Sequence, residues 1–189
     1  DSLFAHQNME INKIKSLVEL FFEKYKEKKS PTKQPFLRWL KNDEDNFLTW
    51  EHAKCNIIIL SEYLKKFLTK GDRCILLSEN RPEWLISDIA IMNAGGVTVP
   101  LFTTYSEKDY EYILNDCKPK ICIVSNSNQL KKIEKFISNE TKVLSIDKLN
   151  QNIENINDIL EKHSKQSPKQ ISLNYNYKIE RKDLACIIY

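Results

Sequence analysis

Four short apolar segments recur at a nearly constant spacing in this chain, and that regularity restricts the fold more than any other feature. They comprise residues 73–77, 97–101, 120–124 and 143–146, so their starts lie 24, 23 and 23 residues apart. Segments that are almost wholly apolar are typical of strands buried on both faces of a sheet. A helical pattern fills each interval, as a parallel crossover connection requires. The spacing therefore predicts an α/β fold with a doubly wound, mostly parallel sheet and flanking helices.

The intervals also carry the residues that begin and end helices. Pro82 suits the first turn of a helix, and the Gly95-Gly96 pair suits its end. Ser106, followed three residues later by Asp109, resembles a capping box. Leucine-rich repeats have a similar period, but their pattern would place an aspartate in its first leucine position, so that architecture is rejected.

Two further elements are predicted before this region. Within residues 1–30, apolar side chains recur with the helical period, which predicts an N-terminal amphipathic helix. Residues 36–40 and 46–50 are rich in aromatic side chains and flank a polar segment, which indicates a small β-hairpin. Thr49 suits the N-cap of a second helix, whose apolar pattern extends to Gly71.

The end of the chain repeats the pattern of a helix followed by a strand. Ile153, Ile156, Ile159 and Leu160 predict a helix, a polar loop follows, and residues 185–189 have the composition of a buried strand. Because a complete domain seldom stops on such residues, the domain is expected to be cut short here.

Charge and hydropathy exclude several classes of protein. The 29 Lys and Arg residues are interleaved with 26 Asp and Glu residues, and a net charge of +3 predicts no nucleic-acid partner. Residues 89–106 carry no charge, but two glycines, a proline and several threonines interrupt them, so a transmembrane helix is rejected. The five cysteines, mostly flanked by Ile or Leu, predict buried, reduced thiols and no metal site.

The start of the chain bears on localisation. It is acidic and amphipathic and lacks a basic segment followed by an apolar one, so no secretory signal is predicted and a cytoplasmic location is expected. The basic run at residues 24–29 suits either a solvated helix end or a peripheral contact with a membrane. No oligomeric state follows from the sequence.

Catalytic motifs are missing from the sequence. It contains no G-x-S-x-G, no H-E-x-x-H and no glycine-rich phosphate loop, so no catalytic residue is expected in this chain. Asp72, Glu79, Glu83 and Asp88 are acids near a strand end, and we interpret them as helix-start and surface charges.

Several segments resemble one enzyme family, the AMP-forming long-chain acyl-CoA synthetases. Residues 71–84 read GDRCILLSENRPEW and closely resemble the corresponding run of that family. The resemblance continues through AGGVTVPLFTTY at 94–105 and YILNDC at 112–117, and it includes LTWE at 48–51 and DLACIIY at 183–189.

This resemblance, which covers residues 36–189, implies a function for a longer parent protein. In the family, ATP, Mg²⁺ and coenzyme A serve to convert a fatty acid into acyl-AMP and then acyl-CoA. Residues 31–189 would be the first α/β subdomain of the large adenylation domain, truncated before the family's phosphate-binding loop, TSGTTGxPKG. The remainder of that domain and a C-terminal domain would be its partners. The fragment is expected to be inactive and to bind no cofactor tightly.

Ligands of open α/β sheets bind where the strands end at their carboxyl side. Each residue placed there also has a structural alternative as a cap, a turn former or a buried strand end. The candidate substrate-binding residues are Ser78, Asn80, Thr103, Thr104, Ser125 and Tyr189.

Two alternatives stay open at this point. One is a free-standing, flavodoxin-like binding or interaction module without adenylation activity. The other is an inactive homologue with a degraded phosphate loop. A truncated domain should expose a contiguous apolar face, whereas a complete module should not.

Overall fold

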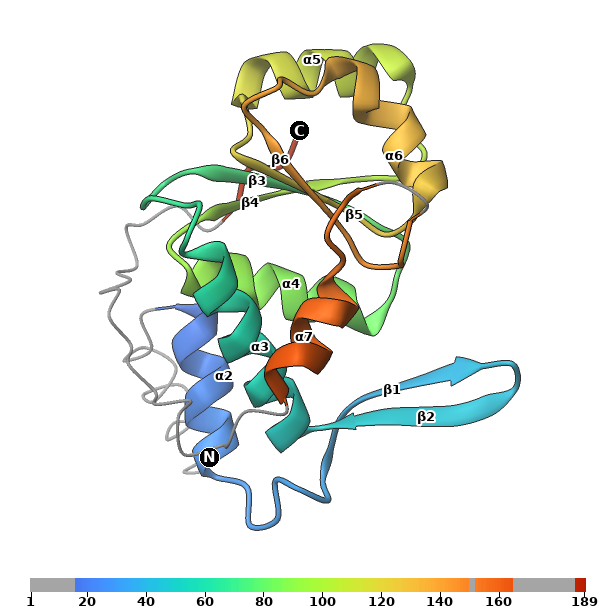
Figure 1. Cartoon of the computed structure of the whole chain (residues 1–189). Helices are drawn as coiled ribbons and strands as arrows, with labels where there is room; N and C mark the ends of the chain where they lie inside the picture. Colours follow the sequence, from blue (N-terminus) through green and yellow to red (C-terminus); the bar gives the residue numbers. More distant parts are fainter. Residues whose placement is uncertain (1–15, 150–151, 165–185) are drawn as a thin grey trace, which may run out of the picture.

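A four-stranded parallel sheet forms the centre of the molecule (Figure 1). Its strands are β3 (Arg73–Leu77), β4 (Val97–Leu101), β5 (Ile121–Val124) and β6 (Lys142–Ser145), in the spatial order β4-β3-β5-β6. Nearly every residue of β3, β4 and β5 is buried, as the apolar segments predicted. The doubly wound α/β fold is thus confirmed.

The computed structural model describes residues 16–149, 152–164 and 186–189. The polar loop predicted after residue 164 lies outside this part of the chain, as do residues 1–15 of the predicted N-terminal helix. Among the described residues, no helix is long and apolar enough to cross a membrane.

Helices cover both faces of the sheet (Figure 1). On one side lie α3 (Trp50–Leu64), α4 (Pro82–Asn93) and α7 (Ile156–Ser164). On the other side lie α5 (Glu107–Cys117) and α6 (Ser127–Ile133). This arrangement explains why the strands lack polar alternation, because neither sheet face meets solvent.

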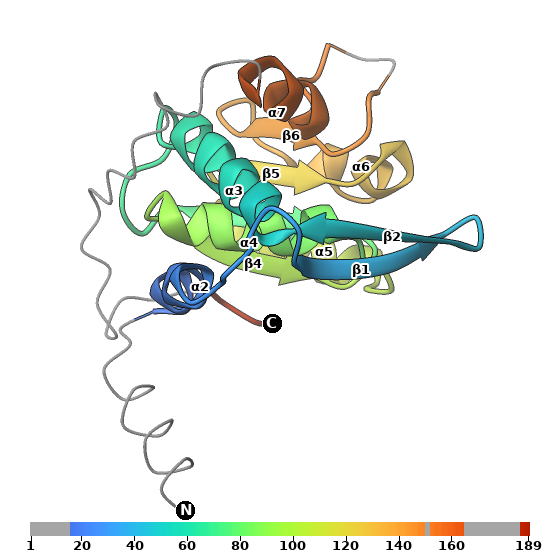
Figure 2. The ribbon, with the colours of Figure 1, turned by 90° about the horizontal axis from the view of Figure 1, so that it is seen from below.

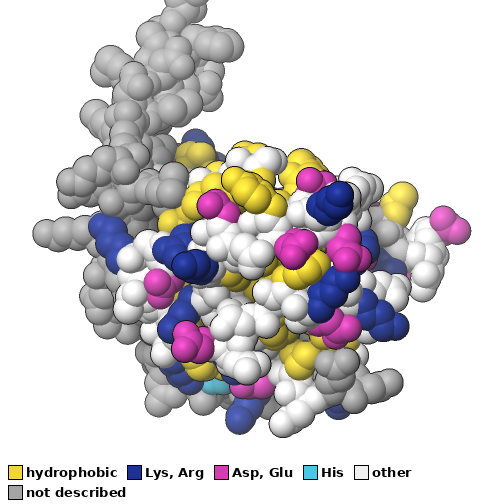
Figure 3. All heavy atoms as spheres, turned by 90° about the horizontal axis from the view of Figure 1, so that it is seen from above, with side chains coloured by type: hydrophobic (Ala, Val, Ile, Leu, Met, Phe, Trp, Pro, Cys, Tyr) yellow, Lys and Arg dark blue, Asp and Glu magenta, His cyan; other side chains and the backbone are white. Residues whose placement is uncertain are grey.

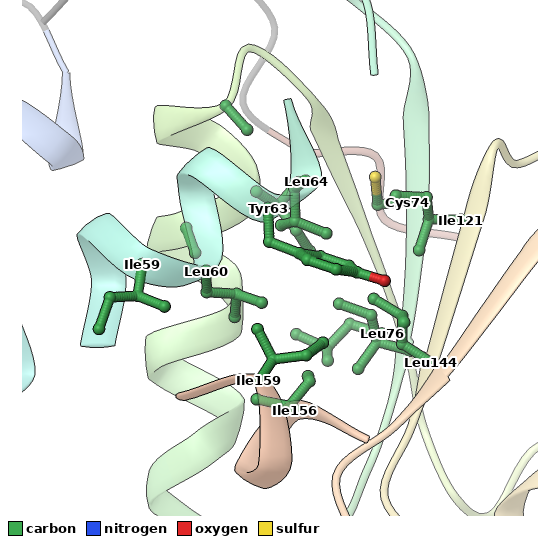
Figure 4. Close-up of a cluster of buried hydrophobic side chains, with 14 of the residues drawn as sticks. Ile59, Leu60, Tyr63, Leu64, Cys74, Leu76, Ile121, Leu144, Ile156 and Ile159 are labelled. Atoms are coloured by element: carbon green, nitrogen blue, oxygen red, sulfur yellow. The ribbon is translucent and has the colours of Figure 1, made fainter. Parts of the chain in front are cut away.

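Each face of the sheet has its own hydrophobic core. The core under α3 and α7 is shown in Figure 4, where Leu60, Leu76 and Leu144 converge and each is fully buried. On the opposite face, Ile75 and Leu77 pack against α5 and α6. Alternate residues of one strand therefore supply two different cores.

A third apolar cluster joins the N-terminal elements to the domain. Phe21 and Phe22 of α2 (Leu17–Lys26) pack on α3 and α4. The β-hairpin of β1 (Pro35–Lys41) and β2 (Glu44–Thr49) contributes Leu48 to this cluster. Side chains of β1 also pack against this cluster, whereas the turn end of the hairpin projects away from the helices (Figures 1 and 2).

The predicted boundaries of the hairpin were wrong. The turn holds two residues, Asn42 and Asp43, instead of the five-residue polar segment, and both have positive φ angles of 53° and 60°. Asn and Asp tolerate this region, which two-residue hairpin turns require, so the strands extend through the charged residues. Trp50 begins α3, and the Thr49 hydroxyl accepts a hydrogen bond from the His52 amide (3.1 Å), which confirms the predicted N-cap.

Other predicted boundaries differ by a few residues. The helix that starts at Trp50 ends at Leu64, and turns continue to Gly71, whose φ of 88° suits glycine. The third interval helix is interrupted, because α6 passes into a short 3-10 helix, Glu134–Phe136. At the end of the chain, Cys186 forms one parallel bridge with Thr98 of β4, so the predicted last strand is reduced to a single pairing.

The cysteines divide into two groups. Cys74, Cys117 and Cys122 are buried, as predicted, and burial raises the pKa of the Cys117 thiol to about 11. Cys186 is exposed and Cys55 is intermediate, so the prediction of buried thiols was wrong for Cys186. Cys186 lies on the outermost segment of the sheet, where no described element covers its side chain.

The capping box at the start of α5 allows a direct test of the predicted helix start. The Asp109 amide donates to the Ser106 hydroxyl (3.2 Å), and the Ser106 amide donates to the Asp109 carboxylate (3.0 Å). Replacing Ser106 by alanine is expected to lower the free energy of unfolding by about 1 kcal/mol. Urea denaturation measures this change. Ser127→Ala, one residue inside α6, is the control, and an equal loss in both variants would contradict the assignment.

Candidate functional site

The carboxyl ends of the strands meet along one edge of the sheet, where the loops after β3, β5 and β6 contact one another. The Ser125 amide donates to the Leu77 carbonyl oxygen (3.0 Å), and the Asp147 amide donates to the Ser125 carbonyl oxygen (2.9 Å). Parallel strands direct all these loops to the same edge, which is where open α/β sheets bind ligands.

Glu79 is the centre of a polar cluster at this edge. Its carboxylate accepts hydrogen bonds from the Ser125 hydroxyl, from Asn126 Nδ2 (3.1 Å) and from Gln129 Nε2 (2.7 Å). Burial by itself would raise the pKa of the Glu79 carboxyl, but the hydrogen bonds outweigh it and lower the pKa to about 2. Glu79 is therefore ionised at neutral pH and links the loop after β3 to the start of α6.

Arg81 makes a second link, to the loop after β6. Its guanidinium group binds both carboxylate oxygens of Asp147, with Nη1–Oδ2 and Nη2–Oδ1 distances of 3.0 and 2.7 Å. Arg81 Nε lies 3.5 Å from Glu83 Oε2. The hydrogen bond to Asp147 is the largest cause of the raised pKa of Arg81. This bidentate geometry restrains the loop after β6 more strongly than a single hydrogen bond would.

Three of the sequence-predicted residues lie beside Glu79. The Ser78 hydroxyl donates to the Glu79 carbonyl oxygen (2.8 Å), and Ser125, which is fully buried, donates to the Glu79 carboxylate. Asn80 is exposed. The structure thus brings Ser78, Asn80 and Ser125 together, and it occupies both serine hydroxyls with internal hydrogen bonds.

The other three candidate residues, Thr103, Thr104 and Tyr189, lie further along the edge, toward β4. The Thr103 carbonyl oxygen accepts a hydrogen bond from Lys132 Nζ (2.7 Å), and Thr104 is exposed. The Tyr189 hydroxyl donates to Asp116 near the end of α5, and the Tyr189 carbonyl oxygen accepts from the Tyr105 hydroxyl (3.0 Å). Tyr189 is therefore held against the α5 side of the sheet.

The interpretation of the four acids as simple helix-start and surface charges was wrong for Glu79. It lies in a loop and holds three donors that come from residues 46 to 50 positions later in the chain. Glu83 does occupy the first turn of α4, as predicted. Asp88 lies in the middle of α4 and not in its first turn, and its partial burial raises the pKa of its carboxyl.

Arg81, Gln129 and Asp147 were missed by sequence reasoning, and they carry much of the polar network. A local sequence signal exists only for Asn126, because asparagine is favoured at helix N-caps. Its side-chain oxygen accepts a hydrogen bond from the Gln129 amide (3.1 Å) at the start of α6. The partners of Glu79 and Arg81 come from other crossover units, so no short spacing reveals them.

The polar cluster around Glu79 is suited to a structural role and not to catalysis. A carboxylate with a pKa of about 2 is a poor general base at neutral pH, because it binds a proton too weakly. Among the described residues, no group of three His, Cys, Asp or Glu side chains is placed to hold a metal ion. The cluster is suited to holding the loops of the edge in one arrangement.

A pocket of about 460 Å³ lies elsewhere, where α5 ends and β6 begins. Lys118 and Lys120 contribute to its rim, and Leu114 and Phe136 supply apolar lining. The pocket is at the opposite edge of the sheet from Glu79, because β5 and β6 start there. It is therefore separate from the edge that carries Glu79.

Comparisons with known proteins identify the family. The sequence model described as AMP-binding enzyme matches residues 24–189. The long-chain-fatty-acid–CoA ligase ACSBG1 of Bos taurus is 32% identical over 94 residues, which cover 47% of this chain and 13% of that protein. Fatty acyl-CoA synthetase A of Dictyostelium discoideum is 38% identical over 71 residues, or 38% of this chain and 10% of that protein. The chain thus matches only about a tenth of the length of these relatives.

Solved structures share the fold at low sequence identity. VinN in complex with 3-methylaspartate superposes with a TM-score of 0.69 at 16% identity, covering 91% of this chain and 43% of VinN. The fatty acyl-adenylate ligase from L. pneumophila gives a TM-score of 0.66 at 17% identity, covering 94% of this chain and 28% of the ligase. The resemblance predicted from the sequence motifs is confirmed by the family match, and the chain belongs to the AMP-binding enzyme family.

Proposed function

We propose that residues 31–189 form the first α/β subdomain of the adenylation domain of an ATP-dependent long-chain fatty acid CoA ligase. The match of residues 24–189 to the AMP-binding enzyme family carries this proposal. The two named relatives, a long-chain-fatty-acid–CoA ligase and a fatty acyl-CoA synthetase, favour a fatty acid as the substrate. The same match disfavours a free-standing, flavodoxin-like module.

The proposed reaction has two steps, because a carboxylate is a poor electrophile. The fatty carboxylate attacks the α-phosphate of ATP and expels pyrophosphate, and the thiol of coenzyme A then attacks the acyl-adenylate and displaces AMP. Mg²⁺ would screen the phosphate charges in the parent enzyme. No group of three His, Cys, Asp or Glu side chains is placed to hold a metal ion among the described residues.

The contribution of this chain is to build a wall of the ligand site. Glu79 and Arg81 hold the loop after β3 against the loops after β5 and β6. Of the six candidate contacts, Asn80 and Thr104 are exposed and are best placed to reach a ligand, whereas Ser78 and Ser125 donate to Glu79. We propose that residues 1–189 are inactive alone.

Thioester formation tests the proposal. The complete product of the gene, supplied with ATP, Mg²⁺, coenzyme A and palmitate, is expected to form palmitoyl-CoA and to release AMP and pyrophosphate, as detected by mass spectrometry. Residues 1–189 under the same conditions are expected to form none. Omission of ATP is the control. A complete gene product that is folded yet forms no acyl-AMP with any fatty acid would contradict the proposal.

A further inference from the structure

The pocket between the end of α5 and the start of β6 has the size and the lining of a small-molecule site. Its volume of about 460 Å³ falls within the range of roughly 300–1,000 Å³ that is typical of such sites. Among the described residues, four apolar and six polar side chains line it. A ligand that fits this lining has to offer both an apolar and a polar surface.

The apolar part of the wall comes from α5 and from the end of the 3-10 helix. Leu114 of α5 is buried, whereas Phe136 and Ile137 are partly buried and pack against the core on the α5 side of the sheet. The Thr141 hydroxyl donates to the Pro119 carbonyl oxygen (2.9 Å), which ties the turn after the 3-10 helix to the start of β5. This wall is therefore fixed in place, and a hydrocarbon body would shield its apolar surface from water.

Two lysines at the rim are held by their backbones and lack partners for their charges. The Lys118 amide donates to the Leu114 carbonyl oxygen (3.1 Å), and the Lys120 amide donates to the Arg73 carbonyl oxygen (2.8 Å). Within the described part of the chain, neither lysine side chain takes part in an ion pair or a hydrogen bond. Glu140 is the one acid among the described lining residues, so two lysines face one glutamate. This excess of positive charge favours an anion.

Lys118 occupies a backbone position that seldom carries lysine. Its φ of 43° and ψ of 68° lie in the left-handed region, where the end of a helix usually has glycine or asparagine. The chain turns sharply here between α5 and β5, and both Lys118 and Lys120 line the pocket as a result. Residues in such sparsely populated regions concentrate at functional sites.

The surrounding surface offers no broad field that could replace these two lysines. Figure 3 shows the face over α5, where Lys and Arg side chains are interspersed with Asp and Glu side chains. Exposed charges of mixed sign largely cancel beyond a Debye length, which is about 8 Å at physiological salt. The attraction of an anion to the pocket therefore depends on Lys118 and Lys120 themselves.

We propose that this pocket binds an amphipathic organic anion that is free in solution. Its anionic head would lie at Lys118 and Lys120, and its hydrocarbon body would lie against Leu114, Phe136 and Ile137. A lysine ammonium group attracts a carboxylate or a phosphate as a point charge, so the head group is specified only by its charge. The inference goes beyond the proposed function and does not depend on it, because the pocket lies at the opposite edge of the sheet from Glu79.

Lysine acetylation tests the inference in the complete gene product. The protein would be treated briefly with N-acetoxysuccinimide, with and without octanoate, and acetylation of each lysine would be quantified by peptide mass spectrometry. Saturating octanoate is expected to slow acetylation of Lys118 and Lys120 by about fivefold or more, because only unoccupied sites react. Lys108 is exposed in the first turn of α5, outside the lining, and is expected to react at an unchanged rate.

A charge-removing variant shows whether Lys118 takes part in binding. Lys118→Asn is expected to keep the fold, because asparagine suits the left-handed backbone at the end of a helix. Loss of one of the two charges should weaken octanoate binding by about threefold to fivefold, as measured through the protection of Lys120. Lys108→Asn is the matched control and should leave the affinity unchanged.

Three probes identify the chemistry that the pocket recognises. Protection by octanoate that 1-octanol and inorganic phosphate do not reproduce would support the inference. Equal protection by 1-octanol would show that the charge is not recognised, and equal protection by phosphate would show that the apolar wall is not used, so either result would overturn it. Protection by phosphatidylglycerol vesicles and not by octanoate would identify a membrane surface as the occupant, and would overturn it as well.

Discussion

Replacing Leu76 by alanine is expected to lower the free energy of unfolding by about 3–4 kcal/mol, the largest effect of any single substitution considered. Leu76 is fully buried at the centre of β3, where it pairs with Pro100 of β4 and Ile123 of β5. Figure 4 shows its side chain among those of Tyr63, Leu144 and neighbouring residues. The lost free energy combines the transfer free energy of the removed methyl groups with the cost of a cavity. The cavity cannot close, because β3 is held between β4 and β5.

Urea denaturation of residues 1–189 at neutral pH, followed by circular dichroism, measures this loss. Leu40→Ala is the matched control, because Leu40 is 75% exposed on the hairpin and its removal should change stability by less than about 0.5 kcal/mol. Similar losses in the two variants would show that the parallel sheet is not the cooperative core of the chain.

Replacing Glu79 by glutamine is expected to lower the free energy of unfolding by about 2 kcal/mol at pH 7. The carboxylate accepts three hydrogen bonds, whereas the amide would offer one acceptor oxygen and would turn its NH₂ group toward another donor. The buried hydroxyl of Ser125 and the amide of Gln129 would then compete for one partner. Glu62→Gln, an exposed acid on α3, is the control and should lose little.

The stability difference between the native chain and Glu79→Gln is expected to depend on pH with a definite sign. The folded-state pKa of Glu79, about 2, lies below its ordinary value of 4.5, so the ionised group stabilises the folded state fully above pH 4.5. That contribution, about 1–2 kcal/mol after allowance for solvent screening, is lost as the pH falls from 4.5 toward 2. The difference in stability between the native chain and Glu79→Gln should therefore narrow over this range. A difference that stays constant from pH 7 to pH 3 would contradict the assigned network.

The elements that the sequence predicted well are those defined by local chemistry. Residues 73–77 and 97–101 form strands with the predicted bounds, because a short apolar run bounded by turn residues favours a buried strand. The caps at Thr49 and Ser106 were also predicted correctly, since a hydroxyl and the amides it caps lie within three residues of each other.

The predictions that failed depended on information from outside the local segment. The hairpin turn required positive φ angles at Asn42 and Asp43, which residue type permits but does not impose. The candidate ligand residues around β3 were placed at the carboxyl edge of the sheet only by the rule that parallel strands all end at one edge. Their individual environments depended on partners in other loops, as the exposed Asn80 and the buried Ser125 show.

By itself, the sequence determined the parallel α/β architecture, most helix starts and the resemblance to AMP-forming acyl-CoA synthetases, because burial patterns, caps and motifs are properties of short segments. Only the tertiary structure decided that Glu79 is the acceptor for Ser125, Asn126 and Gln129, that Arg81 binds Asp147, and that the Tyr105 hydroxyl donates to the Tyr189 carbonyl oxygen. The physical reason is distance along the chain. These groups are 46 to 84 residues apart and meet because parallel strands carry their loops to one edge of the sheet, and no local pattern encodes which loops become neighbours.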